Sequence, residues 1–140
     1  MVATTERALQ CVVVTPERAV LDETVDFVAL PMYDGELGVA PGRAPLVGRL
    51  GYGELRTRVG TRVHRFYVDG GFAQVRHNVV TVLTPRALKA EEVNAKAAAQ
   101  ALEAAKAPGK TPAQQEAQLR AQERARAQLR IARKQGGETV

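Results

Sequence analysis

Valine and alanine divide this sequence into two unlike parts. Residues 1–86 contain sixteen valines and residues 87–140 contain two, whereas alanine occupies sixteen of the last 54 positions. β-Branched residues favour strands and alanine favours helix, so the two parts cannot share one kind of secondary structure. We therefore expect a β domain over 1–86, followed by a helical part over 87–140.

The first part alternates between short apolar runs and turn residues. Many short strands with regular turn signals are typical of a β-sandwich or barrel, and a chain of this length can bury a sufficient core. We expect one of these two architectures, with Gly70-Gly71 ending one strand. The predicted strands are 9–15, 18–22, 24–32, 46–50, 52–59, 62–69, 72–76 and 79–84.

The stretch 35–46 joins two of these strands and is rich in glycine and proline. It reads Gly-Glu-Leu-Gly-Val-Ala-Pro-Gly-Arg-Ala-Pro-Leu. Glycine reaches backbone angles closed to other residues and proline fixes its own, so the stretch predicts a rigid crossover with a type II turn at Pro41-Gly42. Such a loop is either a structural corner or a recognition surface, and the pattern alone favours the corner.

The second part has the pattern of a helical hairpin. Residues 90–107 lack glycine and proline, and Glu92 and Lys96 have the spacing of an i, i+4 ion pair within one helix. The Pro- and Gly-containing stretch 107–112 then ends that helix, because such residues cannot continue it.

A second helix is predicted to run to about Lys134. Thr111 can cap its first turn, and Pro112 suits its first position. Small side chains recur along it at helical spacing: Ala113, Ala117, Ala121, Ala125, Leu129 and Ala132. Because alanines bury little apolar area, we expect the hairpin to detach from the sandwich at modest cost.

The residues needed for common enzyme chemistry are scarce. Serine is absent, which excludes a serine nucleophile, and Cys11 is a single cysteine in an apolar run, where a buried inert thiol is expected. His64 and His77 are isolated, so no metal-binding spacing arises. We expect no catalytic residue, no cofactor and no metal, and the isolated chain is interpreted as not an enzyme.

Two further patterns bear on location. No apolar run approaches the ~20 residues that a membrane-spanning helix requires. The first residues, Met-Val-Ala-Thr-Thr-Glu, lack the apolar region of a signal peptide. The expected location is therefore cytosolic, or peripheral on a cytosolic membrane face.

Positive charge is concentrated in the second helix. The net charge is +5, yet residues 1–86 hold ten Lys/Arg against nine Asp/Glu, and positions 120–134 hold six basic residues and one acidic residue. One interpretation is a solvated face with pairs such as Glu116–Arg120. Another is an acidic protein partner. A third is a nucleic-acid-binding module, which the near-neutral first part and the 4% aromatic content disfavour.

Several motifs together resemble one known family. The motif Gly-Glu-Leu-Gly-x-x-Pro-Gly-x-Ala-Pro-Leu at 35–46 is similar to the signature of the epsilon subunit of F-type ATP synthases. Tyr-Val-Asp-Gly-Gly-Phe-Ala-Gln-Val at 67–75 and Asn-Val-Val-Thr-Val-Leu at 78–83 resemble later strands of that family, and Ala-Gln-Leu-Arg at 127–130 resembles its last helix. The resemblance covers nearly the whole chain in order. The family commonly has His where this chain has Arg43.

The resemblance implies a flattened β-sandwich over 1–86 that clamps the gamma stalk and rests on the membrane c-ring. The helical hairpin over 87–140 would inhibit ATP hydrolysis by meeting the alpha and beta catalytic subunits. The chain would be a peripheral protein on the cytoplasmic face of the bacterial inner membrane, with no nucleic-acid partner. The implied stalk and ring contacts are Tyr33, Asp34, Glu36, Leu37 and Arg43. The implied inhibitory residues are Arg120, Arg124, Arg126 and Arg130.

Some members of this family bind ATP through an Ile/Leu-Asp-x-x-Arg-Ala motif in the first helix. The matching stretch here is Val-Asn-Ala-Lys-Ala-Ala at 93–98, with Asn94 at the Asp position and Ala97 at the Arg position. The charges that would hold the nucleotide are missing, so we expect no tight ATP binding.

Overall fold

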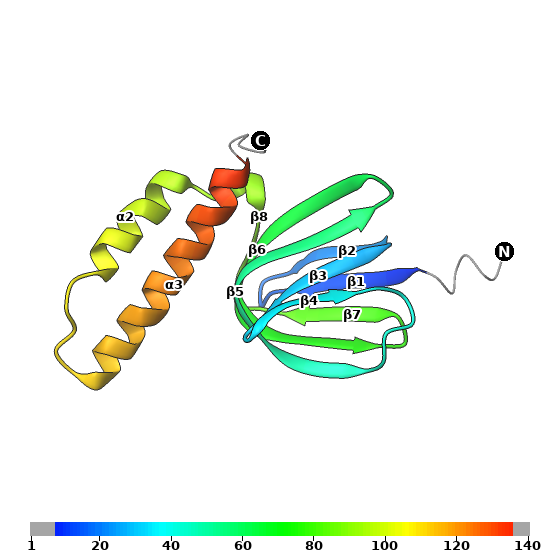
Figure 1. The fold of residues 1–140 in the computed structure, drawn as a ribbon, viewed down its shortest axis with the longest axis horizontal. Coiled ribbons are helices and arrows are strands. Elements are labelled where there is room, and N and C mark those ends of the chain that lie inside the picture. The colour runs from blue at the N-terminus through cyan, green and yellow to red at the C-terminus, as the bar shows by residue number, and fades with distance from the viewer. Residues whose placement is uncertain (1–7, 136–140) are drawn as a thin grey trace. The chain divides into compact units, whose positions relative to one another are not determined.

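A computed structural model describes residues 8–135 of the chain. The chain divides into two compact units, Met1–Ala87 and Leu88–Val140. The first is built of β-strands and the second of helices (Figure 1). This agrees with the predicted order of a β-sandwich followed by two helices.

The β unit contains one continuous sheet that folds over on itself. Its hydrogen-bonded order is β2-β1-β7-β6-β5-β3-β4. Neighbouring strands are antiparallel except for β1 and β7, which run parallel. These strands are β1 (Leu9–Val14), β2 (Ala19–Val25), β3 (Phe27–Met32), β4 (Gly35–Val39), β5 (Leu46–Val59), β6 (Arg62–Arg76) and β7 (Val79–Leu83); a short strand β8 (Ala87–Lys89) follows where the two units join in sequence.

The long strands β5 and β6 pass through both layers of the sandwich. The last residues of β6, from Phe72 onward, pair with β7, whereas β3 pairs chiefly with the second half of β5. Gly70 and Gly71 have φ values of +79° and +107°, which glycine adopts with little strain. Figure 1 shows both strands bending as they pass from one layer to the other.

This bend corrects two expectations, because the strands predicted at 46–50 and 52–59 are one strand, and so are those predicted at 62–69 and 72–76. Gly70-Gly71 was predicted to end a strand, but β6 continues through it, just as β5 continues through Gly51. A Cβ at Gly71 would lie 2.0 Å from the carbonyl oxygen of Leu83, so only glycine fits where the strands approach this closely. The two glycines therefore bend a continuous strand.

The core lies between the layers and follows the alternation of side chains along each strand. In β1, Leu9, Cys11 and Val13 are fully buried while the residues between them are partly exposed. Leu30, Leu55 and other side chains of β3, β5, β6 and β7 complete the same cluster. Because successive strand side chains point to opposite faces, this pattern fixes the register of each strand.

The helical unit contains a short 3-10 turn η1 (Ala90–Glu92) and the helices α2 (Ala95–Ala105) and α3 (Pro112–Gln135). The single helix expected over 90–107 is thus interrupted. The Asn94 side chain accepts a hydrogen bond from the Ala97 amide and caps α2. Glu92 lies in η1, outside α2, and accepts from the Lys89 amide, so Glu92 and Lys96 do not share one helix as expected.

The start of α3 agrees with the sequence. The Thr111 hydroxyl accepts from the Gln114 amide, and Pro112 is the first helical residue. The α2–α3 contact includes a hydrogen bond from the Gln122 side chain to the Ala105 carbonyl at 2.9 Å. Of the predicted stripe, Ala125 is buried, whereas Ala113 and Ala117 are exposed. Neither helix, within the part of the chain described, is long and apolar enough to cross a membrane.

Candidate interaction surfaces

The tight turn between β3 and β4 presents Tyr33. Tyr33 is 68% exposed as a residue, and the Arg49 guanidinium lies 4.5 Å from the centroid of its ring. The Tyr33 amide also donates to the Arg49 carbonyl at 2.8 Å. Asp34 is exposed beside it at the tip of the turn. The turn thus offers an aromatic ring that is held in place and still accessible.

The glycine- and proline-rich stretch is only partly a loop. Gly35–Val39 forms β4, paired antiparallel with β3, so the expected crossover over 35–46 shortens to residues 40–45. Gly42 has φ +89°, as the third residue of a type II turn requires. Val39 ends in the layer that contains β3, and Leu46 begins the part of β5 that pairs with the end of β6. The crossover therefore links the two layers.

The remaining predicted contact residues have different environments. Leu37 is partly buried and packs against the core. Glu36 forms an ion pair with Arg56 at 2.7 Å, which joins β4 to β5 across β3. This hydrogen bond is the largest cause of the raised pKa of Arg56. Arg43 is exposed in the crossover. The five residues therefore differ in exposure and in their partners.

The β unit also carries exposed apolar side chains that the sequence reasoning did not identify. We name the set Val47, Phe72, Val79 and Leu83 the apolar face. Phe72 is 58% exposed and lies directly opposite Leu83, which is 53% exposed, on the neighbouring strand. Val47 of β5 is 73% exposed. The sequence signal was present, because Phe72 takes the outward parity of a strand whose Ala73 and Val75 point inward.

Helix α3 exposes its arginines to different degrees. Arg120 lies 3.8 Å from Glu116, the exposed pair that the sequence suggested. The Arg126 guanidinium donates to the Gln122 side chain at 3.4 Å. Arg130 is exposed, whereas Arg124 is partly buried. Exposed pairs of this kind stabilise a helix by only about 0.5 kcal/mol.

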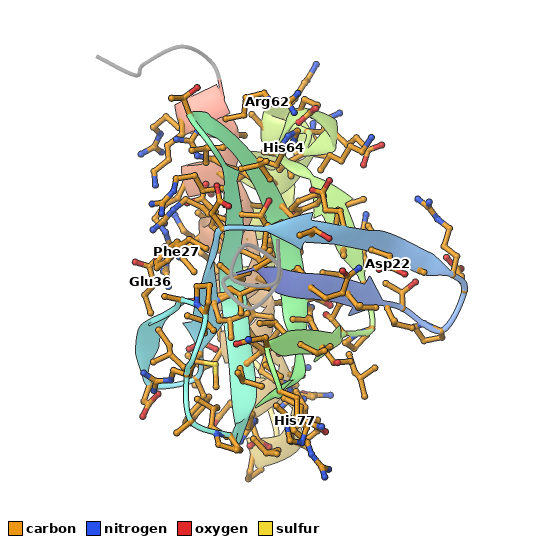
Figure 2. The ribbon with its side chains drawn as sticks, turned by 90° about the vertical axis from the view of Figure 1, so that its right-hand side faces the viewer. Asp22, Phe27, Glu36, Arg62, His64 and His77 are labelled. Atoms are coloured by element: carbon orange, nitrogen blue, oxygen red, sulfur yellow. The ribbon has the colours of Figure 1, made fainter. Side chains whose placement is uncertain are left out.

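The groups considered for chemistry are dispersed. His64 lies at one end of the β unit together with Arg62, and His77 lies at the other end (Figure 2). Within residues 8–135, no group of three or more His, Cys, Asp or Glu is placed to hold a metal ion. Burial, aided by the charges of Glu23 and Asp22, raises the pKa of the Cys11 thiol to about 12. That thiol is protonated at neutral pH and is a poor nucleophile.

Comparison with known sequences matches this chain to a described family. The pattern of the ATP synthase Delta/Epsilon chain β-sandwich domain covers residues 8–90. The ATP synthase epsilon chain of Rhodopirellula baltica is 63% identical over 81 residues, which are 58% of this chain and 63% of that relative. The epsilon chain of Nitratidesulfovibrio vulgaris strain Miyazaki F is 42% identical over 96 residues, 69% of this chain and 72% of the relative.

Solved structures show the same fold. A chain of the Euglena gracilis mitochondrial ATP synthase, in a structure of its OSCP, F1 and c-ring, superposes with a TM-score of 0.79 and 26% identity, covering 86% of this chain and 79% of that one. A chain of the Tetrahymena thermophila mitochondrial ATP synthase central stalk and c-ring gives a TM-score of 0.71 at 17% identity, covering 89% and 96%.

Proposed function

Because the chain belongs to the family of ATP synthase epsilon chains, we propose that it is the non-catalytic epsilon subunit of an F-type ATP synthase central stalk. In this role the β unit couples rotation of a proton-driven c-ring to the catalytic head. The helical unit restrains ATP hydrolysis. The protein acts on the cytoplasmic face of a bacterial inner membrane, attached through its complex.

The observation that carries this proposal is the apolar face. Large apolar side chains that are exposed next to one another, as Phe72 and Leu83 are, are typical of a surface that a partner covers. Phe72 and Leu83 lie opposite each other on paired strands, and Arg49 lies opposite Phe72 on its other side. We assign this face to the gamma subunit, because a permanent stalk contact requires apolar area to remove from water.

The turn and the crossover supply the proposed polar part of the stalk and ring contact. Tyr33 is exposed and oriented by Arg49, and Asp34 and Arg43 are exposed charges. Glu36 contributes through its pairing with Arg56. Leu37 supports this surface, because its partly buried side chain packs against the core.

The gamma contact is tested by placing one charge on the apolar face. Phe72→Asp should lower the affinity of the full chain for purified gamma subunit at least tenfold, because a buried unpaired carboxylate costs more than the ~1.4 kcal/mol that this factor represents. Val63→Asp is the matched control: Val63 is 48% exposed in the part of β6 that belongs to the other layer. Equal affinities for the two variants would overturn the assignment. If a pull-down with the full chain recovered RNA in place of gamma, the nucleic-acid alternative would be favoured.

The proposed inhibitory contact involves Arg120, Arg124, Arg126 and Arg130 with acidic residues of the beta subunits. Changing all four to Glu reverses the charge of α3, so ATP hydrolysis by the reconstituted complex should rise while assembly is unchanged. Lys96→Glu with Lys110→Glu is the control, since both lysines are exposed outside α3. High salt should relieve wild-type inhibition by screening the same charges. A quadruple variant that assembles normally and hydrolyses ATP at the wild-type rate would refute the inhibitory role.

A further inference from the structure

The Asn78 side chain holds the crossover from a neighbouring turn. Its Oδ1 accepts a hydrogen bond from the Gly42 amide at 2.8 Å, although the two residues are 36 positions apart. Its backbone carbonyl accepts from the Gln10 amide at 2.9 Å. Asn78 thus joins the crossover, the β6–β7 turn and the start of β1.

The backbone at this turn is in a conformation that glycine would adopt more easily. His77 and Asn78 have φ values of +52° and +61°, both in the left-handed region, between the paired residues Arg76 and Val79. Two-residue hairpins of this type favour glycine at the second position, because most side chains are strained there; asparagine is among the best tolerated. A side chain is present at position 78 in spite of this strain. This side chain accepts the hydrogen bond from the Gly42 amide.

The bonded amide belongs to the residue before Arg43. Gly42 itself has φ +89°, a value open to several turn conformations when glycine is unrestrained. A hydrogen bond to its amide selects one of them, and the direction of the Arg43 side chain follows from that choice. The residue that bonds this amide belongs to the β6–β7 turn, which is remote in sequence from the crossover that carries Arg43.

We propose that Asn78 is a positioning residue: it fixes the Pro41–Arg43 turn and so sets the presentation of Arg43 to the stalk and ring. This inference rests on the contact proposed above for Arg43. It adds a residue outside the crossover to the determinants of binding.

A second bond of the same kind provides a control within the chain. The Asp26 carboxylate accepts from the Gly60 amide at 2.6 Å and holds the β5–β6 hairpin. Gly60 also has a positive φ, +61°. That hairpin adjoins Arg62, which lies at the end of the β unit opposite His77, the neighbour of Asn78 (Figure 2). Loss of the Asp26 bond should therefore weaken the fold locally without changing the crossover.

The test uses the full chain and two measurements. Amide exchange of Gly42 is followed by nuclear magnetic resonance, and affinity is measured for a purified subcomplex of gamma and c-ring from the same organism. Asn78→Gly removes the acceptor and keeps the backbone conformation. It should accelerate Gly42 exchange and weaken binding, each about fivefold, the factor expected for one hydrogen bond. Its Tm should change little, because the lost bond is offset by relief of backbone strain.

The comparison variants separate positioning from stability. Asn78→Asp keeps the acceptor and should retain slow Gly42 exchange and wild-type affinity. Asp26→Ala should lower Tm but leave Gly42 exchange and affinity unchanged. The inference is wrong if Asn78→Gly leaves Gly42 exchange unchanged, or if affinity falls equally in Asn78→Gly and Asp26→Ala.

Arg43→Ala distinguishes the two possible failures. If Arg43→Ala weakens binding and Asn78→Gly does not, the role of Asn78 is refuted and the Arg43 contact stands. If Arg43→Ala binds as the wild type does, the Arg43 contact is refuted, and presentation of Arg43 by Asn78 is refuted with it. Gly42 exchange in Asn78→Gly then decides whether Asn78 fixes the turn.

Discussion

The Arg49 guanidinium stacks 4.5 Å above the centre of the Tyr33 ring, and the same two residues share a backbone hydrogen bond of 2.8 Å. The pair links the β3–β4 turn to the start of β5. Because Tyr33 stays 68% exposed, the arginine orients the ring without burying it. An aromatic residue fixed in this way loses little conformational freedom when a partner covers it.

A double-mutant cycle measures this pair. Arg49→Ala and Tyr33→Ala should show a coupling free energy of about 0.5–1 kcal/mol in urea unfolding, the range of an exposed cation–π contact. The Arg58–Phe27 pair, at 5.0 Å, is a reference contact of the same type. Strictly additive effects at Arg49 and Tyr33 would mean that the stacking contributes no stability.

The Cys11 thiol should make stability depend on pH in the alkaline range. Its pKa rises from 9.0 to about 12 on folding, chiefly through burial. The contribution is complete below pH 9 and is lost as pH rises toward 12, because the unfolded thiol then releases its proton while the folded thiol keeps it. The urea midpoint of the wild type should fall more steeply from pH 8 to pH 10.5 than that of Cys11→Ala. Parallel slopes would contradict the burial of the thiol.

The β unit should fold without the helices. A chain ending at Ala87 retains the complete apolar cluster between the two layers. We expect a cooperative thermal transition, followed by circular dichroism, and amide-exchange protection in β1, β6 and β7. A molten product that binds hydrophobic dyes would show that the helices are needed to complete the core.

Free ATP should not bind tightly. The residue at the Asp position of the nucleotide motif is Asn94, whose side chain caps α2. The residue at the Arg position is Ala97, whose amide donates the capping hydrogen bond to Asn94. Calorimetric titration should find no micromolar affinity. Asn94→Ala should lower the stability of α2 by about 1 kcal/mol, while Asn94→Asp preserves it, because both Asn and Asp cap helices well. A micromolar dissociation constant for the wild type would mean that other residues form the site.

Local sequence signals predicted the element types well and the continuity of elements poorly. The Thr111 cap with Pro112 located the start of α3 because its chemistry is complete within four residues. The strand end predicted at Gly70-Gly71 is wrong, because glycine in a strand marks either an end or a bend. Only the pairing of β6 with both β5 and β7 decides between them. The same holds for β4, which is recognised as a strand only through β3.

The candidate surfaces depended even more on tertiary structure. Exposure of Phe72 requires knowledge of which face of its strand meets the core, and alternation with Ala73 and Val75 contained that information. No local pattern predicts that Asn78 reaches Gly42, because the bond joins segments 36 residues apart. Nor does spacing reveal that Glu36 pairs with Arg56 across an intervening strand.

The parallel pairing of β1 with β7 has a consequence for synthesis of the chain. Cys11 of β1 pairs with Val80 of β7, so β1 cannot form this pairing until almost the whole β unit has been synthesised. The β5–β6 hairpin is local and can form early, since loop closure costs less entropy for nearby segments. On the ribosome the sheet therefore closes only once β7 has emerged. Until then β1 keeps an open edge, and release of the chain before residue 83 would leave that edge exposed to aggregation.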